Sequence, residues 1–384
     1  MIPIVVVAFN RPRSLARLLG SLSKACYPSD NVPLIISIDR GENNGDVLQV
    51  ANNFEWTHGE KKVVYQEKNL KLRRHVLKCG DISQEYGGVI VLEDDLYVAP
   101  DFYNYAVQAM SFSKKDSRIG GISLYNHLYN VTVFEPFEAI DDGYDNWYFQ
   151  FASSWGQAWT AEQWLAFRKW YEENEGKDLS GDDIPATVTN WSASSWLKYF
   201  IKFLVVTDKY FIYPRKSYTT NFGDSGTHVD SNNTNFQVPL CGEIRDAFHF
   251  SKLDEASGVY DSFFENVTLA KHLNLEKSEL SVDLYGVKAR GTHRYFLTSQ
   301  KLDCKIIKSF AREMRPVEAN VLFDIPGNDF FLYDTQTEAK NAFVSNDLSK
   351  LNYNIRVFRK DVYPLLFKQF LKEVKHYVKK KTKK

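Results

Sequence analysis

The sequence predicts an α/β fold with a mostly parallel sheet flanked by helices, and two observations support this prediction. From residue 2 to about residue 102, short apolar runs rich in Val and Ile alternate with segments of helical spacing. This alternation is typical of a doubly wound parallel sheet. Several of the apolar runs also stop abruptly at polar residues, as Val89–Leu92 does at Glu93-Asp94-Asp95.

The first part of the chain gives the clearest order of elements. We expect strands at 2–9, 33–38, 62–66 and 89–92, and helices at 14–22, 46–54, 73–85 and from residue 102 on. Ser14 is the expected N-cap of the first helix. Strands one, two and four end at Asn10-Arg11, Asp39-Arg40 and the three acids, so their ends meet in one crevice if these strands are neighbours. No glycine-rich phosphate loop follows any strand, which argues against a dinucleotide or Walker site.

The rest of the chain is less regular. We expect a strand at 118–124, helices at 155–170, 191–203 and 254–272, and a loop over the crevice at 210–230. Short strands are expected at 281–285, 320–323 and 330–333. These patterns divide the chain into a ligand-binding and catalytic domain (1–245), an accessory α+β region (246–358) and a basic amphipathic helix (359–384).

Composition excludes several classes of protein. The net charge is zero, which disfavours a broad nucleic-acid-binding surface. No segment has the roughly 18 uninterrupted apolar residues of a membrane span. The first strand leaves no room for a signal peptide, and the four scattered cysteines indicate reduced thiols, so we expect a cytoplasmic protein. The chain holds 22 Tyr, 27 Phe and 8 Trp; we expect most of them in the core, with a sugar-stacking cleft as the alternative.

The three acids at 93–95 are the main candidate for chemistry. Carboxylates crowded at a strand end repel one another unless a positive charge lies among them. They are hard oxygen ligands that suit Mg²⁺ or Mn²⁺. We therefore expect a divalent cation holding a phosphorylated substrate, against the alternative of a solvated acidic turn.

The last 26 residues form a separate basic segment. They hold ten Lys or Arg against two acids, and apolar residues from Tyr363 to Val378 recur on one helical face. Two interpretations stay open. The helix either packs on the body of the protein or attaches to an anionic membrane surface, where each Lys or Arg adds about 1 kcal/mol.

The segment Val91–Tyr105 resembles the metal-site segment of GT-A glycosyltransferases, which have a Rossmann-like fold. It is especially similar to the N-acetylglucosaminyltransferase family of N-glycan branching and to bacterial family 2 glycosyltransferases. Weaker matches to the same family occur at 6–12, 38–41, 154–159 and 213–228, in the order that the family has. The resemblance covers roughly residues 2–230.

The resemblance implies a role for individual residues. On the donor side, the base pocket would be lined by Phe9, Asn10 and Arg11, uracil or ribose would bind Asp39, and phosphate would meet Arg73 or Arg74. The donor side also includes Glu93 and Asp94, with Asp94 at ribose or bound water, and the metal ligand is Asp95. The acceptor side is marked by Trp155 and Trp191. His228 is implied as a second metal ligand or a diphosphate contact, and its alternative is a surface loop histidine.

The catalytic base departs from the family pattern. An inverting enzyme of this family has a carboxylate in a Trp-Asp-like segment, but the matching residues 189–196 contain no acid. Asp182, Asp183 or Asp224 remains as the base candidate.

These observations predict a metal-dependent glycosyltransferase, hexosyl or N-acetylhexosaminyl, that uses a UDP-linked sugar and Mn²⁺ or Mg²⁺. The implied acceptor is a glycan or lipid-linked glycan of bacterial surface-polysaccharide synthesis, at the inner face of the membrane. One alternative is a catalytically degenerate carbohydrate-binding or scaffolding subunit. The other is a nucleotidyltransferase, which the missing phosphate loop disfavours.

Overall fold

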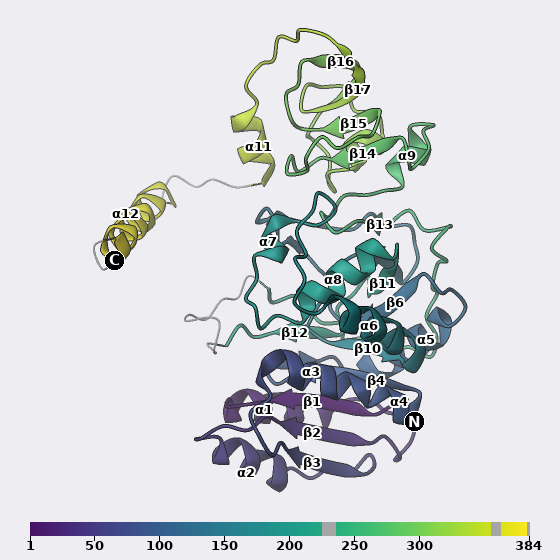
Figure 1. Cartoon of the computed structure of the whole chain (residues 1–384), viewed down its shortest axis with the longest axis vertical. Helices are drawn as coiled ribbons and strands as arrows, with labels where there is room; N and C mark the ends of the chain where they lie inside the picture. The colour runs from purple at the N-terminus through teal and green to yellow at the C-terminus, as the bar shows by residue number, and fades with distance from the viewer. Residues whose placement is uncertain (225–235, 355–361, 382–384) are drawn as a thin grey trace.

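A computed structural model describes residues 1–224, 236–354 and 362–381. A large sheet with its helices forms the body of the molecule, and a smaller sheet lies at one end of it (Figure 1). Helix α12 (Val362–Lys381) stands apart from both in this view. The predicted α/β class, with helices flanking a large sheet, is confirmed.

The large sheet has nine strands in the order β13-β9-β11-β6-β10-β4-β1-β2-β3. Its strands are β1 (Ile4–Ala8), β2 (Leu34–Ile38), β3 (Lys61–Tyr65), β4 (Gly88–Glu93), β6 (Ile119–Ser123), β9 (Asn146–Phe149), β10 (Gln157–Thr160), β11 (Tyr210–Pro214) and β13 (Val259–Tyr260). Strands β4, β1, β2 and β3 are all parallel, whereas β10 runs antiparallel to both of its neighbours. As predicted, the ends of β1, β2 and β4 therefore lie side by side.

Both faces of the sheet are covered, because alternate residues of β1 enter two different cores. Ile4 and Val6 pack with α1 (Pro12–Leu22), α2 (Gly45–Asn53) and α5 (Phe102–Ser113). Val5 and Val7 pack with α3 (Lys71–Asp81), α6 (Ala161–Asn174) and α8 (Leu197–Val206). A strand buried on both faces reads as a continuous apolar run, which is why these strands were visible in the sequence. Most aromatic residues also lie in the core, as predicted.

Several predicted boundaries are wrong for local reasons. Arg11, not Ser14, is the N-cap residue of α1, because Pro12 takes the first helical position. Residues 157–160 form β10 before α6 begins, and α8 begins at Leu197 after the short α7 (Ala186–Thr189). The segment expected as a crevice loop contains β11 and also β12 (Thr219–Asn221), which pairs with β5 (Leu96–Val98).

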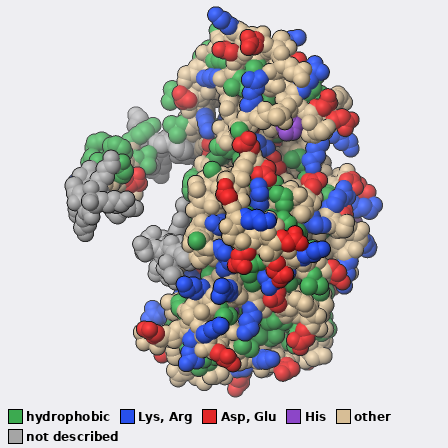
Figure 2. Space-filling view, in the orientation of Figure 1, with side chains coloured by type: hydrophobic (Ala, Val, Ile, Leu, Met, Phe, Trp, Pro, Cys, Tyr) green, Lys and Arg blue, Asp and Glu red, His purple; other side chains and the backbone are tan. Residues whose placement is uncertain are grey.

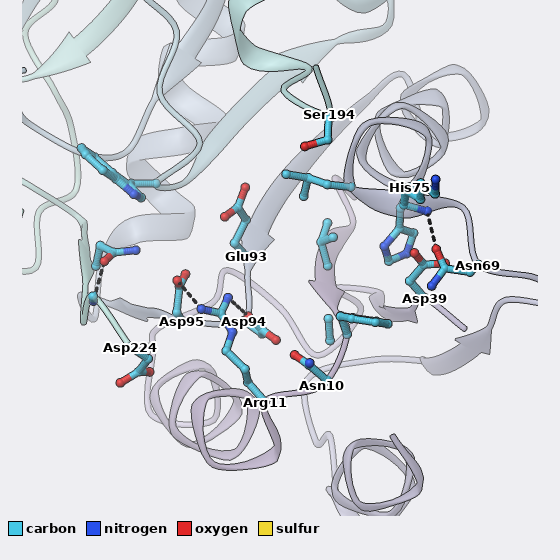
Figure 3. A pocket seen from close by; sticks show the side chains of 18 of the residues that line it. Asn10, Arg11, Asp39, Asn69, His75, Glu93, Asp94, Asp95, Ser194 and Asp224 are labelled. Atoms are coloured by element: carbon cyan, nitrogen blue, oxygen red, sulfur yellow. Dashed lines mark hydrogen bonds and ion pairs between the residues drawn. The ribbon is translucent and has the colours of Figure 1, made fainter. Parts of the chain in front are cut away.

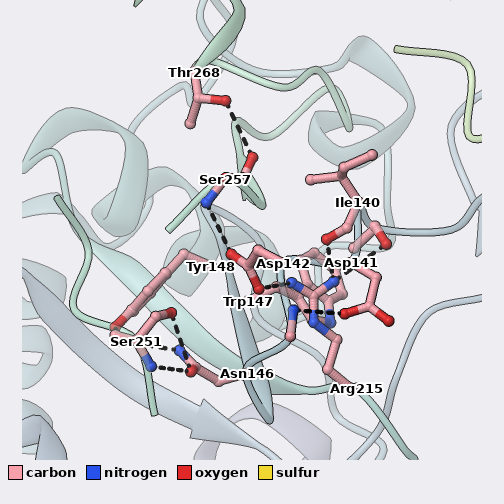
Figure 4. A network of polar contacts seen from close by, with 12 residues as sticks. Ile140, Asp141, Asp142, Asn146, Trp147, Tyr148, Arg215, Ser251, Ser257 and Thr268 are labelled. Atoms are coloured by element: carbon pink, nitrogen blue, oxygen red, sulfur yellow. Dashed lines mark hydrogen bonds and ion pairs between the residues drawn. The ribbon is translucent and has the colours of Figure 1, made fainter. Parts of the chain in front are cut away.

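The segment expected as a helix at 254–272 is mostly irregular, with only α9 (Leu269–His272) helical. Polar side chains from β9 and its preceding loop hold this backbone in place (Figure 4). Asp142 Oδ2 accepts from the Ser257 amide at 2.9 Å, and just before the segment Asn146 Oδ1 accepts from the Ser251 amide at 2.7 Å. Arg215 Nη2 in turn donates to Asp142 Oδ1 at 2.7 Å. A backbone amide that is satisfied in this way, like that of Ser257, does not depend on a helix for its partner.

The smaller sheet has four strands in the order β14-β15-β17-β16. They are β14 (Leu280–Asp283), β15 (Tyr295–Thr298), β16 (Cys304–Phe310) and β17 (Phe330–Glu338). The strand expected at 320–323 is instead the helix α10 (Ala319–Leu322). The large sheet takes its edge strand β13 from beyond residue 245, so it draws on two of the predicted units.

The remaining elements are short or peripheral. They are α4 (Ser83–Tyr86), β7 (Tyr129–Asn130), β8 (Glu135–Pro136), α11 (Asp347–Asn354) and α12. The side chains of α12 that the structure describes are exposed, including Phe367 at 62% and Phe370 at 58%. Figure 2 shows its apolar side chains gathered away from the body. Among the described residues, no helix combines the length and the hydrophobicity that a membrane crossing needs.

Candidate active site

A cavity of about 620 Å³ opens where the ends of β1, β2 and β4 meet (Figure 3). Its walls come from loops that follow these strands and from the start of α3. Further lining residues lie just before and just after residues 225–235, which are outside the described part of the chain. The lining residues are Val7, Ala8, Phe9, Asn10, Arg11, Asp39, Asn69, Lys71, Leu72, His75, Glu93, Asp94, Asp95, Trp155, Ser194, Asn221, Gly223, Asp224 and Phe236. The crevice predicted from the strand ends therefore exists.

The acid pair at the end of β4 is held by one guanidinium group. Arg11 Nη1 donates to Asp95 Oδ2 at 2.8 Å, and Arg11 Nη2 donates to Asp94 Oδ1. Burial opposes the charged form of Arg11, but the two carboxylates outweigh it and raise the pKa of Arg11. Burial raises the pKa of Asp94 to about 6, against the influence of Arg11. The expected positive charge among the acids is thus supplied by the chain itself.

Glu93 is the remaining acid of the run, and its carboxyl points into the cavity (Figure 3). Burial raises the pKa of Glu93 to about 8, and the neighbouring Asp95 adds to this. Near neutral pH, Glu93 is therefore largely protonated, which lowers the repulsion within the run of acids.

The residues present fit a divalent cation at Asp95. Its second oxygen, Oδ1, is buried and has no hydrogen-bond partner, which is costly unless a ligand completes it. Within the described residues, no three His, Cys, Asp or Glu side chains are grouped to hold a metal ion by themselves. A site with one protein carboxylate suits Mg²⁺ or Mn²⁺ bound together with phosphate oxygens and water. His228, the implied second ligand, lies outside the described residues.

Asp39 marks the other end of the cavity, at the end of β2. Its Oδ1 accepts from the backbone amides of Leu70 at 2.8 Å and Arg40 at 2.9 Å. Asn44 donates to the Asp39 carbonyl at 2.7 Å and to the Phe9 carbonyl at 3.1 Å, which ties the ends of β1 and β2 together.

His75 lies beside Asp39 and was not predicted. It is on α3, one position beyond the arginines expected at phosphate, and only 2% exposed. Its Nε2 shares a hydrogen bond with Ser37 Oγ at 2.8 Å, and Gln66 Nε2 donates to the same hydroxyl at 3.0 Å. Burial lowers the pKa of His75 to about 4, so the ring is neutral near neutral pH. The helical spacing of α3 could have indicated which of its polar residues faces the sheet.

Asp224 lines the cavity but is tied to α1. Ser14 Oγ donates to Asp224 Oδ2 at 2.6 Å, and Arg17 forms an ion pair with the same carboxylate. Burial works to raise the pKa of Asp224, yet the hydrogen bonds from Arg17 and Ser14 leave it below its ordinary value. A carboxylate stabilised in this way is a weak proton acceptor.

Other predicted residues do not reach the cavity. Asp183 pairs with Lys202 Nζ at 2.7 Å outside the lining. Arg73 donates to the Ala193 carbonyl, next to the lining residue Ser194, and Arg74 is exposed outside the cavity. Trp191 packs against the core beside Phe151.

Trp155 is the one predicted acceptor-side tryptophan that lines the cavity. Its ring lies 4.8 Å from that of Phe236, which begins the described chain after the gap. Ser194, Asn221, Asn69 and Lys71 also line the cavity and were not named as site residues. Asn221 and Ser194 lie in the segments 213–228 and 189–196 considered above, whereas Asn69 and Lys71 lie in neither.

The fold and the cavity define an α/β protein with a ligand site at the carboxyl edge of parallel strands. A family model described as the GNT-I family matches residues 1–131. The resemblance predicted from the acidic segment is thereby confirmed for the part of the chain that contains Arg11, Asp39 and Asp95.

The chain is also similar to solved structures. S. aureus TarS 1-349 in complex with UDP-GlcNAc is 12% identical with a TM-score of 0.38, over 61% of this chain and 62% of that one. The mannosyltransferase PcManGT from Pyrobaculum calidifontis, in complex with GDP-Man and Mn²⁺, is 13% identical with a TM-score of 0.31, over 49% and 50%. A structure of S. aureus TarS is 13% identical with a TM-score of 0.35, over 57% and 36%. The chain thus spans less than two thirds of each structure.

Proposed function

We propose that the protein is a glycosyltransferase that moves a hexosyl or N-acetylhexosaminyl group from a UDP-linked sugar to an acceptor hydroxyl. One observation carries the proposal: a single cavity holds Asp39 at one strand end and the Asp94–Asp95 pair at another, with Arg11 beside the pair. The match of residues 1–131 to the GNT-I family supports the same activity.

The donor would lie along the strand ends. Asp39 and the neutral His75 face the part of the cavity that suits a polar base and ribose, with Phe9 and Asn10 beside them. The diphosphate would lie toward Arg11, because a guanidinium group binds phosphate oxygens through two parallel hydrogen bonds. Glu93 and Asp94 complete the donor side.

Asp95 would hold the Mn²⁺ or Mg²⁺ through its unpartnered Oδ1. Such an ion, when bound, stabilises the negative charge that develops on the leaving diphosphate. Arg11 contributes positive charge at the same place, and the burial of the site strengthens both effects.

The acceptor would enter on the side of Trp155, whose ring offers a flat apolar face to a sugar. Of the three base candidates, Asp224 lines the cavity, whereas Asp182 and Asp183 do not. For Asp224 to accept a proton from the acceptor hydroxyl, its ion pair with Arg17 must loosen first.

Product analysis tests the proposal. The protein is incubated with UDP-sugars, Mn²⁺ and a panel of glycan and lipid-linked glycan acceptors. Release of UDP with growth of the acceptor supports the proposal, whereas release of inorganic diphosphate indicates a nucleotidyltransferase. Calorimetric binding of UDP-sugar with no turnover on any acceptor would indicate a carbohydrate-binding or scaffolding subunit instead.

We also propose that the protein works at an anionic membrane surface, which suits a lipid-linked acceptor of bacterial surface-glycan synthesis. The support comes from α12, where Phe367, Phe370 and Leu371 are exposed on one side of the helix. Helical spacing places Lys368, Lys372 and Lys375 on the flank next to this apolar side. An apolar face beside a row of Lys is typical of helices that lie in the membrane interface.

Vesicle flotation tests this placement. The full chain should float with vesicles containing 30 mol% phosphatidylserine and stay behind with pure phosphatidylcholine, and high salt should weaken the binding. The double variant F367S/F370S should lose flotation while its UDP binding stays unchanged. Equal flotation of this variant and the wild type would contradict the proposal.

A further inference from the structure

We propose that Arg11 is a built-in counter-ion that makes dication binding at Asp95 conditional on a diphosphate group. The inference deepens the proposed function, since it takes the phosphorylated donor and the metal ligand from it. It concerns the order in which the site accepts its two charged partners.

The geometry places Arg11 where a second cation would have to go. One guanidinium group spans both carboxylates, with Nη1 2.8 Å from Asp95 Oδ2 and Nη2 bonded to Asp94 Oδ1. The Asp94 side chain is 3% exposed and that of Asp95 is 11% exposed, so water screens these charges only weakly. A dication bound at Asp95 Oδ1 would therefore lie next to the positive charge of Arg11.

Charge balance shows why neither partner binds well alone. With both carboxylates ionised, Arg11, Asp94 and Asp95 together carry one net negative charge. A dication alone leaves a net positive charge with Arg11 still in place, and the two negative charges of a sugar-linked diphosphate alone add to the negative charge already there. Both partners together restore the original balance, so each should favour the other by the same factor.

The chemistry of Arg11 allows the exchange. Guanidinium binds phosphate oxygens as readily as carboxylate oxygens, in the same two-pronged geometry. Arg11 is the N-cap residue of α1 and its side chain is 24% exposed, so it lies at the border of the cavity with room to turn. When a diphosphate takes over Arg11, Asp95 Oδ2 is released and joins Oδ1 as a free oxygen.

A second arginine of the same helix provides a matched control. Arg17 also pairs with a cavity acid, Asp224, and stacks on the Phe222 ring at 3.7 Å. It makes no ion pair with Asp94 or Asp95 among the described contacts. Its removal alters the charge of the region without uncovering the acid pair.

The test is a calorimetric titration of the full chain with Mn²⁺, with and without saturating UDP. In the wild type, UDP should tighten Mn²⁺ binding by about 10-fold or more. R11M should bind Mn²⁺ alone about 10-fold more tightly than the wild type and should lose most of the effect of UDP. In R17M the acid pair stays covered by Arg11, so UDP should tighten Mn²⁺ binding as it does in the wild type, and D95N should abolish Mn²⁺ binding in every background. R11Q serves as a second neutral variant if R11M does not fold.

Equal Mn²⁺ affinity of wild type and the neutral Arg11 variants would overturn the inference, even if the wild type binds UDP. Conversely, tighter Mn²⁺ binding by R11M in a protein that does not bind UDP would leave the counter-ion role standing and reject the UDP donor. An equal gain in Mn²⁺ affinity in R17M would show that the effect reflects net charge alone, and it would also overturn the inference.

Discussion

The two acidic ends of the cavity are stabilised in different ways. Asp39, at the end of β2, accepts hydrogen bonds from two backbone amides. At the end of β4, Asp95 accepts from the side chain of Arg11, which also pairs with Asp94. Backbone amides are fixed by the fold, whereas an arginine side chain can turn away. The Asp39 end is therefore a preformed contact, and the Asp95 end can exchange its partner.

The largest effect should come from D95A. It removes the proposed metal ligand and leaves Arg11 with a single partner, so sugar transfer should fall by at least about 10²-fold. Transfer from UDP-sugar is measured with and without excess chelator, and thermal unfolding checks the fold. Wild-type turnover by D95A would refute the role of this end of the site in charge stabilisation.

D39N tests the preformed end and should have a smaller effect. The amide keeps the size of the side chain but loses the charge that accepts from Leu70 and Arg40, so UDP affinity should fall by about 10-fold. The affinity is measured by calorimetry, with Mn²⁺ present throughout. If Mn²⁺ affinity changed as strongly as UDP affinity, the two ends would not be separate contacts.

A last prediction concerns stability rather than ligand binding, and it lies in the pH response of His75. Its pKa is about 4 in the folded protein, below the ordinary value of about 6.5, so only the unfolded chain takes up this proton between the two values. The contribution of the neutral ring is present above pH 6.5 and is lost as the pH falls toward 4. Between pH 7.5 and pH 5 this amounts to about 2 kcal/mol.

Denaturant unfolding of H75Q at these two pH values gives the comparison. The variant should lose about 2 kcal/mol less on acidification than the wild type, because glutamine does not titrate. The pKa of another buried histidine, His127, is also lowered by burial. Because His127 is present in both proteins, its contribution to the pH dependence cancels. Identical losses would show that His75 is not held neutral beside Asp39.

The sequence was informative where a strand is buried on both faces. β1, β2 and β4 appear as apolar runs that stop at polar residues, and this pattern predicted both the sheet and the edge that carries Asp39 and Asp95. It was misleading where side chains satisfy the backbone from far away in the chain. The segment 254–272, whose Ser257 amide is held by Asp142, was expected to be a helix, but only α9 (Leu269–His272) is helical.

The sequence by itself determined the α/β class and the acids of the site, since strand ends and charge runs are local properties of the chain. Only the tertiary structure decided which cation each acid meets. Arg11 and Asp95 are 84 positions apart, and Arg17 and Asp224 are 207 apart. The first pair forms because the parallel strands β1 and β4 bring their ends to one edge, and no local pattern records either long-range contact.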